Sequence, residues 1–302
     1  MEKVYDLIII GCGPAGMSAA IYARRFNLSV LILEYNAPGG AMVNTEEISN
    51  YPGVNTINGV DLSMQMYTQM MSLNVDYQGV KVLEIIKNKE KDFVVKGSNK
   101  EFYSKSIIIA TGTRNRVLNI ESEKKFFYRG ISWCAICDGP LYKGKDVAVI
   151  GGGNSALSAA LTLSKFVNKV YLVHRRSEFR SEKIITEKVL NNKKIELILN
   201  SNVIDFTGDQ LLDGIIVKNK DEEQRKIAVS GCFEEIGRLP NTEFLKGIEL
   251  SSDGYIIVNE DCKTSVDGIY ACGDVILKKV RQIATAVNDG AIAGLAVSNY
   301  LS

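Results

Sequence analysis

The sequence predicts an α/β protein with two βαβ units of the Rossmann type. Three observations support this: one glycine turn occurs twice, an apolar β-branched run precedes each copy, and a helical pattern with a second apolar run follows it. The copies share their spacing, because Glu34 stands 23 positions after Gly11 and His174 stands 23 positions after Gly151. The repeat therefore predicts two structurally similar units in one chain.

The first unit begins with "YDLIII" at 5–10, which is typical of a buried parallel strand. A GxGxxG turn follows, then a helical pattern at 17–26 and a strand, "SVLILE", that ends in Glu34. Glycines allow a pyrophosphate to approach the helix, and a terminal carboxylate suits ribose hydroxyls, so we predict a dinucleotide site for FAD or NAD. Its turn residues are Gly11, Gly13, Pro14, Ala15 and Gly16.

The second unit repeats this order with "DVAVI" at 146–150, a GxGxxA turn, a helical pattern at 157–166 and the strand "KVYLV" at 169–173. The predicted binding residues of this turn are Gly151, Gly153, Asn154, Ser155 and Ala156.

A basic cluster stands where the second unit should carry its ribose-binding acid. His174 occupies that position, Arg175 and Arg176 follow it, and Arg180 lies four residues further on. Guanidinium groups grip a ribose 2′-phosphate in a bidentate manner, whereas a carboxylate repels it. We therefore predict an NADPH site that includes all four residues, with a solvated basic surface as the alternative.

The stretch "SWCAICDGP" at 132–140 places Cys134 and Cys137 three positions apart. A zinc site needs more ligands, but His174 is the only histidine and the other four cysteines are scattered singly. A redox pair is the leading interpretation, and two reduced bystanders are the alternative. Asp138 either supplies a proton to a departing thiolate or serves only as a turn residue.

Composition limits the remaining classes of function. The chain has 302 residues, enough for about two domains, with ordinary shares of hydrophobic (46%) and charged (24%) residues. Because the net charge is +1 and no apolar run reaches about 18 residues, we expect no nucleic-acid or membrane partner and a cytoplasmic location. A flavin accepts a hydride and passes an electron pair to sulfur, which favours FAD between NADPH and the cysteine pair.

Further motifs extend along the whole chain. They are "GCGPAG" at 11–16, "GGAMVNTEEISNYPG" at 39–53, "ATG" at 110–112, "CAICDG" at 134–139, "GGGNSA" at 151–156, "HRRSEFR" at 174–180, "GRLPNT" at 237–242, "GIYACGDV" at 268–275 and "RQIATAVNDG" at 281–290. Together they resemble the low-molecular-weight, bacterial-type thioredoxin reductase family. The CxxCD shortly before the second glycine turn is the most specific of them.

The resemblance implies a discontinuous FAD domain at 1–113 and 245–302, with an NADPH domain inserted at 114–244 that carries the CxxC. It implies a homodimeric enzyme that passes electrons from NADPH through FAD to the Cys134–Cys137 disulfide, and then to thioredoxin or a similar protein. Two alternatives remain open. One is a reductase of the same fold that takes electrons from NADH or ferredoxin, and the other is a non-enzymatic redox- or nucleotide-sensing module.

The resemblance also implies residue roles. Glu34 would hold the adenosine ribose of FAD, and Asp274 its ribityl chain or pyrophosphate. The remaining FAD-site residues would be Gly40, Asn50, Thr111, Gly112, Gly273, Arg281 and Gln282. The chain departs from the family pattern at Ala41, Ser158, Ala159, Glu234, Glu235 and Cys272. Of these, Glu234 and Glu235 fall on a strand that we expect to be largely buried.

Overall fold

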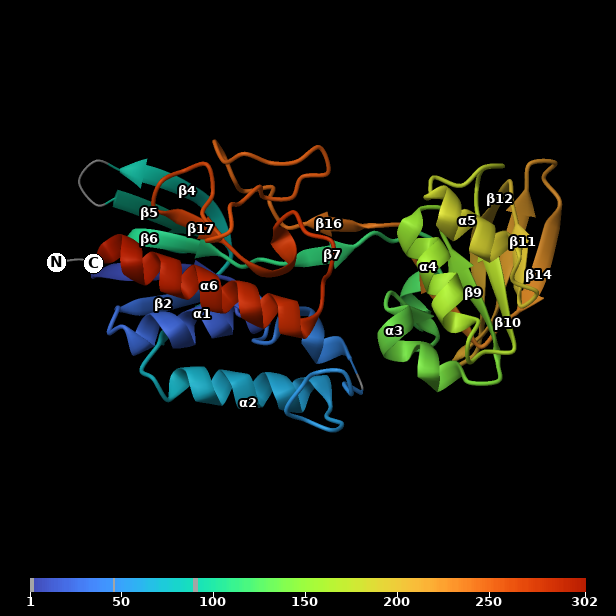
Figure 1. Cartoon of the computed structure of the whole chain (residues 1–302), viewed down its shortest axis with the longest axis horizontal. Coiled ribbons are helices and arrows are strands. Elements are labelled where there is room, and N and C mark those ends of the chain that lie inside the picture. The colour runs from blue at the N-terminus through green and yellow to red at the C-terminus, as the bar shows by residue number, and fades with distance from the viewer. Residues whose placement is uncertain (1–2, 46, 89–91) are drawn as a thin grey trace. The chain divides into compact units, whose positions relative to one another are not determined.

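The computed structural model describes residues 3–45, 47–88 and 92–302, so that within the 39–53 motif position 46 lies outside the described residues. It divides into two compact units (Figure 1). Unit 1 comprises Met1–Arg114 and Leu239–Ser302, and unit 2 comprises Asn115–Arg238. The second junction therefore follows Arg238, whereas the expected one follows Phe244.

Unit 1 is built on one sheet. Its described strands, in spatial order, are β3 (Asp76–Gly79), β2 (Val30–Glu34), β1 (Val4–Ile10), β6 (Glu101–Ile109), β5 (Asp92–Gly97) and β4 (Val82–Asn88), and β17 (Ile269–Ala271) also pairs with β6. The neighbours of β1 are parallel to it, with Leu7 opposite Val30. Since strand side chains alternate, Leu7 and Ile9 enter one buried cluster while Ile8 and Ile10 enter another.

Helices cover the Leu7 and Ile9 face of this sheet (Figure 1). The helical segments of unit 1 are α1 (Pro14–Arg25), α2 (Gly59–Met71), α6 (Ile283–Leu301) and the 3₁₀ turns η1 (Gly40–Asn44) and η4 (Gly273–Val275). Helix α6 packs very closely on α1, because a Cβ added at Gly290 would lie 2.2 Å from the Ala15 carbonyl oxygen. Only glycine fits there.

Unit 2 has a five-stranded parallel sheet among its described residues. The order is β11 (Ile195–Ile198), β10 (Lys169–Val173), β9 (Asp146–Ile150), β15 (Gly231–Glu234) and β8 (Ile131–Ser132). One face packs on α4, and the other on an antiparallel sheet, which again reflects alternation along β9. The remaining elements are η2 (Glu123–Phe126), α3 (Ala135–Asp138), η3 (Gly139–Tyr142), α4 (Asn154–Leu163), α5 (Lys183–Leu190), β12 (Ser201–Gly208), β13 (Leu212–Asn219) and β14 (Gln224–Ala228).

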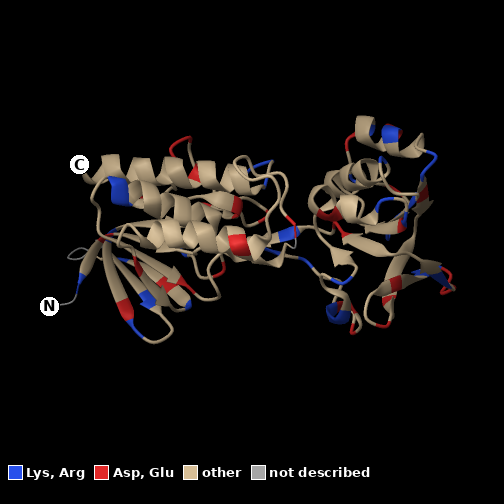
Figure 2. Ribbon diagram, turned by 90° about the horizontal axis from the view of Figure 1, so that it is seen from below, with Lys and Arg blue, Asp and Glu red and all other residues tan. Residues whose placement is uncertain are grey.

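Two short strands, β7 (Thr113–Asn115) and β16 (Arg238–Pro240), pair at the connections between the units. Acidic and basic residues are interspersed over each unit (Figure 2), in line with the net charge of +1. Within the described residues, no helix combines the length and apolar character needed to cross a membrane. The predicted fold class, an α/β protein with two Rossmann-type βαβ units, is confirmed.

Candidate functional site

The first glycine turn connects β1 to α1. A Cβ at Gly11 would lie 2.4 Å from the Ala110 carbonyl oxygen, and one at Gly16 would lie 2.0 Å from the Gly11 carbonyl oxygen, so both positions are closed by the protein itself. At Gly13 the nearest described atom would be the Gly40 Cα at 3.9 Å. Gly13 therefore leaves open space beside the turn, into which a ligand phosphate can approach the backbone.

Glu34 ends β2 and holds this turn in place. Its Oε2 atom accepts a hydrogen bond from the Cys12 amide at 2.7 Å, and its Oε1 atom accepts one from the Asn36 amide at 2.8 Å. The carboxylate is thus placed next to the glycine turn, as the predicted ribose ligand requires, and it also supports the turn. The sequence did not predict this second role.

The second glycine turn, between β9 and α4, has the same division of roles. A Cβ at Gly151 would lie 2.4 Å from the Glu235 carbonyl oxygen, and Ala156 at the third position is fully buried. At Gly153 the nearest described atom would be the Arg180 carbonyl oxygen at 3.9 Å. The middle glycine of each turn therefore faces open space while the outer positions close the fold.

His174 is buried against this turn. Its ring lies over Gly152, stacks on Phe179 with ring centroids 5.5 Å apart, and places Nε2 3.1 Å from the Glu178 carbonyl oxygen. Burial first, and then the neighbouring arginines, lower the pKa of His174, which keeps the ring neutral. The structure therefore gives His174 a packing role, and its predicted contact with the cofactor remains a prediction.

The three arginines after β10 line one cavity of about 520 Å³. Its lining residues are Arg175, Arg176, Ser177, Glu178, Phe179, Arg180 and Asn200. The Arg180 amide donates to the Gly152 carbonyl oxygen at 2.7 Å, which ties this loop to the glycine turn. Three guanidinium groups around one hollow beside a nucleotide-type turn suit a phosphate dianion.

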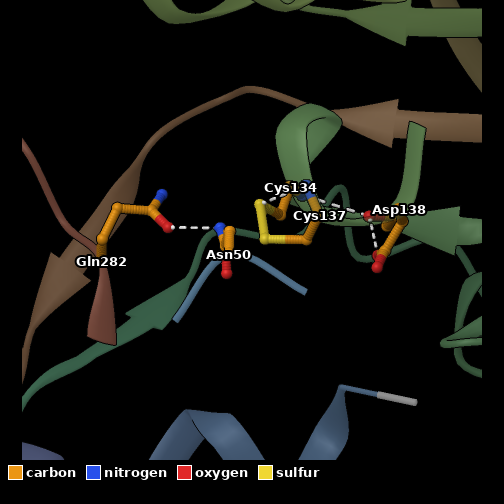
Figure 3. The surroundings of a disulfide bond; sticks show 6 residues. Asn50, Cys134, Cys137, Asp138 and Gln282 are labelled. Atoms are coloured by element: carbon orange, nitrogen blue, oxygen red, sulfur yellow. Dashed lines mark hydrogen bonds between the residues drawn. A yellow bond between two sulfur atoms is a disulfide. The ribbon is translucent and has the colours of Figure 1, made fainter. Parts of the chain in front are cut away.

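Cys134 and Cys137 form a disulfide with their Cα atoms 5.3 Å apart (Figure 3). Cys134 caps the short helix α3, and its Sγ atom accepts the Cys137 amide hydrogen bond at 3.2 Å. Such a donor stabilises negative charge on Cys134 sulfur once the disulfide is reduced. Both cysteines are partly exposed, so an external disulfide can reach this pair.

Ser132 organises the surroundings of the pair. Its hydroxyl donates to Asp138 Oδ2 at 2.6 Å and accepts the Cys134 amide hydrogen bond at 3.1 Å. Asp138 thus lies at the redox pair, while its proposed function as a proton donor remains a prediction. The sequence did not identify Ser132, although it stands two positions before Cys134.

The other four cysteines are reduced and buried, namely Cys12, Cys232, Cys262 and Cys272. Burial raises the pKa of Cys12 and of Cys262 to about 12, with a smaller contribution from nearby carboxylates. Burial also raises the pKa values of Cys232 and Cys272 well above the ordinary thiol value. Thiols that stay protonated are poor nucleophiles, so the chemistry is confined to Cys134 and Cys137.

The remaining predicted residues lie in unit 1. Asn50 Nδ2 donates to Gln282 Oε1 at 3.2 Å, so these two do meet (Figure 3). Arg281 donates to the backbone carbonyls of Asp274, Ile276 and Lys278, which makes it a support for that loop, and its place in the FAD site remains a prediction.

The Thr111 hydroxyl donates a hydrogen bond to the Asn241 carbonyl oxygen, and the Thr111 carbonyl oxygen accepts one from Asn241 Nδ2. Positive φ values at Gly40 (59°), Gly112 (63°) and Gly273 (78°) explain the glycines there. A Cβ at Gly273 would lie 2.7 Å from the Ala15 Cβ at the start of α1. The loop that carries Asp274 therefore reaches the first glycine turn.

Glu234 is buried, as expected for its strand, whereas Glu235 follows the end of β15 and is only half-buried. Glu234 is 2% exposed at the end of β15, and its Oε2 atom accepts a hydrogen bond from Trp133 Nε1 at 3.2 Å. Burial raises the pKa of Glu235 to about 7, although Arg238 acts in the opposite direction. Glu123 is buried as well, and the sequence had singled out neither it nor Trp133.

Comparisons with known proteins agree over the whole chain. A family described as pyridine nucleotide-disulphide oxidoreductase matches residues 5–290. The thioredoxin reductase of Bacillus subtilis is 39% identical over 99% of this chain and 96% of its own length, and that of Ureaplasma parvum is 40% identical over 100% and 98%. The crystal structure of thioredoxin reductase from Streptococcus pyogenes superposes with a TM-score of 0.92 at 41% identity, covering 100% of this chain and 99% of that one.

Proposed function

Because the chain belongs to the thioredoxin reductase family of the pyridine nucleotide-disulphide oxidoreductases, we propose that it is an NADPH-dependent, FAD-containing enzyme that reduces thioredoxin through Cys134 and Cys137. The family expected from the sequence motifs is confirmed. The observation that supports the reaction most directly is the partly exposed Cys134–Cys137 disulfide, with the Cys137 amide directed at Cys134 sulfur.

The chemistry at sulfur is thiol–disulfide exchange. In the reduced protein, a Cys134 thiolate attacks one sulfur of the thioredoxin disulfide, and the other sulfur leaves as a thiolate that takes up a proton. Cys137 then displaces the reduced thioredoxin and regenerates the Cys134–Cys137 disulfide. Each turnover consumes one NADPH and one proton for each thioredoxin disulfide reduced to two thiols.

The first glycine turn fits FAD. Gly13 leaves room for a pyrophosphate at the start of α1, and Glu34 presents a carboxylate beside it for ribose hydroxyls. Bound FAD would supply the two-electron link between a hydride donor and a disulfide. A yellow flavin spectrum in the purified protein is the expected result, and its absence would favour the non-enzymatic sensing module.

The second glycine turn fits NADPH. Gly153 leaves equivalent room at the start of α4, and Arg175, Arg176 and Arg180 line the adjoining cavity. The cationic lining favours a donor with a 2′-phosphate over NADH. A homodimer and a cytoplasmic location belong to the same proposal, and light scattering and cell fractionation test them.

The reaction itself is tested by anaerobic addition of NADPH, or separately NADH, to the purified protein with a bacterial thioredoxin in its disulfide form. We expect NADPH oxidation to match the thioredoxin disulfide reduced, one to one, with NADH much slower. If NADPH bleaches the flavin while the thioredoxin disulfide persists, thioredoxin is not the substrate.

Substitution of Glu34 tests the FAD site. We expect Glu34→Ala to weaken FAD binding by about 10- to 150-fold, because a charge-assisted hydrogen bond contributes about 1.5–3 kcal/mol. The flavin retained after extended dialysis measures this, and NADPH binding should be unchanged.

Glu34→Gln separates the two roles of this side chain. Its amide oxygen still accepts the Cys12 hydrogen bond at the turn, while the bond from the Asn36 amide is lost and the neutral side chain lacks the carboxylate that ribose hydroxyls require. Weak FAD binding in both variants fits ribose recognition. Full flavin retention by Glu34→Gln means that the carboxylate serves only the turn.

A further inference from the structure

The carboxyl group of Glu234 is buried with few donors. Its Oε2 atom accepts one hydrogen bond, from the neutral indole of Trp133, and the buried Oε1 atom meets no donor among the described residues. A buried carboxylate with one neutral donor and one orphaned oxygen is strongly unfavourable. A proton on Oε1 removes the charge and converts the orphaned acceptor into a donor.

Glu123 is the partner to which such a donor can point. It is 1% exposed, and its oxygens accept backbone hydrogen bonds from Leu118 at 2.7 Å and Ile120 at 3.3 Å. Glu123 therefore has two amide donors, whereas Glu234 has one indole donor. Of these two neighbouring buried carboxyls, Glu234 is the one whose orphaned oxygen gains from a proton, which it can donate to Glu123.

The charges around the pair agree with this assignment. Burial first, and then the charge and hydrogen bond of Glu123, raise the pKa of Glu234 to about 9, while Trp133 acts in the opposite direction. The third titratable group nearby is Cys232, whose thiol pKa is raised by burial and by both glutamates. Its thiol is therefore neutral.

The Glu234 carboxyl fixes the residue that precedes the redox pair. In the β15–β8 register, Phe233 lies opposite Ser132, which brings Glu234 alongside Trp133. The indole also makes edge-on contacts with Phe127 at 5.0 Å and Tyr128 at 5.7 Å between ring centroids. One hydrogen bond and two rings thus hold the side chain whose backbone continues directly into Cys134.

We propose that Glu234 is a positioning residue for the redox pair: as a carboxylic acid that shares its proton with Glu123, it fixes the Trp133 indole and thereby the backbone that carries Cys134. The effect on thioredoxin reduction rests on the proposed function. The hydrogen-bonded arrangement itself does not, so the two are measured separately.

The single tryptophan of the chain reports on this arrangement directly. In the oxidised, FAD-loaded protein labelled with ¹⁵N-tryptophan, the only indole N–H resonance belongs to Trp133. We expect it to shift with pH with a midpoint near 9, as Glu234 loses its proton. Glu234→Gln, whose amide accepts from Trp133 and donates to Glu123, should keep the resonance position without the titration.

Two further variants isolate the cause. Glu234→Leu removes the acceptor, so the indole proton should exchange faster with solvent and its resonance should move. Tyr128→Phe removes a phenol that packs on the indole and itself titrates at alkaline pH, and the shift near pH 9 should persist in it. Two results overturn the proposal. One is a wild-type indole resonance that does not shift between pH 6 and 10. The other is a pH-dependent shift that persists in Glu234→Gln but is lost in Tyr128→Phe.

Activity tests the consequence for Cys134. We expect Glu234→Leu to lower kcat/KM for thioredoxin about tenfold while NADPH reduces the flavin at the wild-type rate, and Glu234→Gln to stay within about twofold. Equal activity of both variants refutes the positioning role. If the wild type does not reduce thioredoxin, the proposed function fails, whereas the indole titration still decides how Glu234 holds Trp133.

Discussion

Cys134→Ser and Cys137→Ser should each lower thioredoxin reduction by at least about a thousandfold, because exchange needs one sulfur to attack and a second to resolve the mixed disulfide. Both variants should still accept electrons from NADPH into the flavin, since neither cysteine belongs to a glycine turn. Thiol production in thioredoxin and flavin bleaching, measured on the same samples, separate the two half-reactions.

Cys262→Ser provides the matched control for this pair. Its thiol is buried with a pKa near 12, so we expect activity within about twofold of the wild type. If either Cys134→Ser or Cys137→Ser reduced thioredoxin at the wild-type rate, the disulfide would not take part in the reaction and the proposed function would be wrong.

The two variants should also differ from each other. In Cys137→Ser the backbone amide that donates to Cys134 sulfur remains, so Cys134 stays a reactive thiolate and should trap thioredoxin as a mixed disulfide. Cys134→Ser should trap little. Trapping by Cys134→Ser alone would keep the reaction but exchange the roles of the two sulfurs.

Joint replacement of Arg175 and Arg180 by alanine should raise the KM for NADPH about 100-fold and that for NADH less than about threefold. Each phosphate contact contributes about 1.5–3 kcal/mol when desolvated, and solvent exposure of these side chains reduces that value. Steady-state kinetics with both donors measure the ratio.

Arg225→Ala controls for a general loss of positive charge in unit 2. Arg225 is exposed and pairs with Glu196 rather than lining the cavity, so NADPH kinetics should not change. If the double variant affects NADPH and NADH equally, the three arginines are a solvated patch, and the donor specificity proposed above is wrong.

The sequence predicted those parts of the site that are formed locally. Strand, glycine turn, helix and second strand occupy about 30 consecutive residues, so the roles of Gly11 and Gly151 follow from spacing and sterics alone. The CxxC is equally local. The insertion of one domain into another came only from the family resemblance, because no periodicity specifies which distant segments share a sheet.

Tertiary contacts explain what the sequence missed. Trp133 and Glu234 are separated by 101 positions, and the sequence gives no sign that β8 and β15 are neighbours. Arg281 donates to three carbonyl groups of its own loop, a supporting role that the sequence did not predict, while its place in the FAD site remains a prediction. His174 likewise completes the packing over Gly152, where a Cβ would meet its ring at 2.1 Å.

The close packing of α6 on α1 also affects how the chain folds during synthesis. On the ribosome, unit 2 emerges complete once Arg238 has left the exit tunnel, and it can fold as a unit. The first residues made must wait longer, because the surface of α1 around Ala15 is covered only when Gly290 and the rest of α6 arrive. The part of the chain that is translated first is therefore the last to be enclosed, and until then its apolar helix surface is open to chaperones.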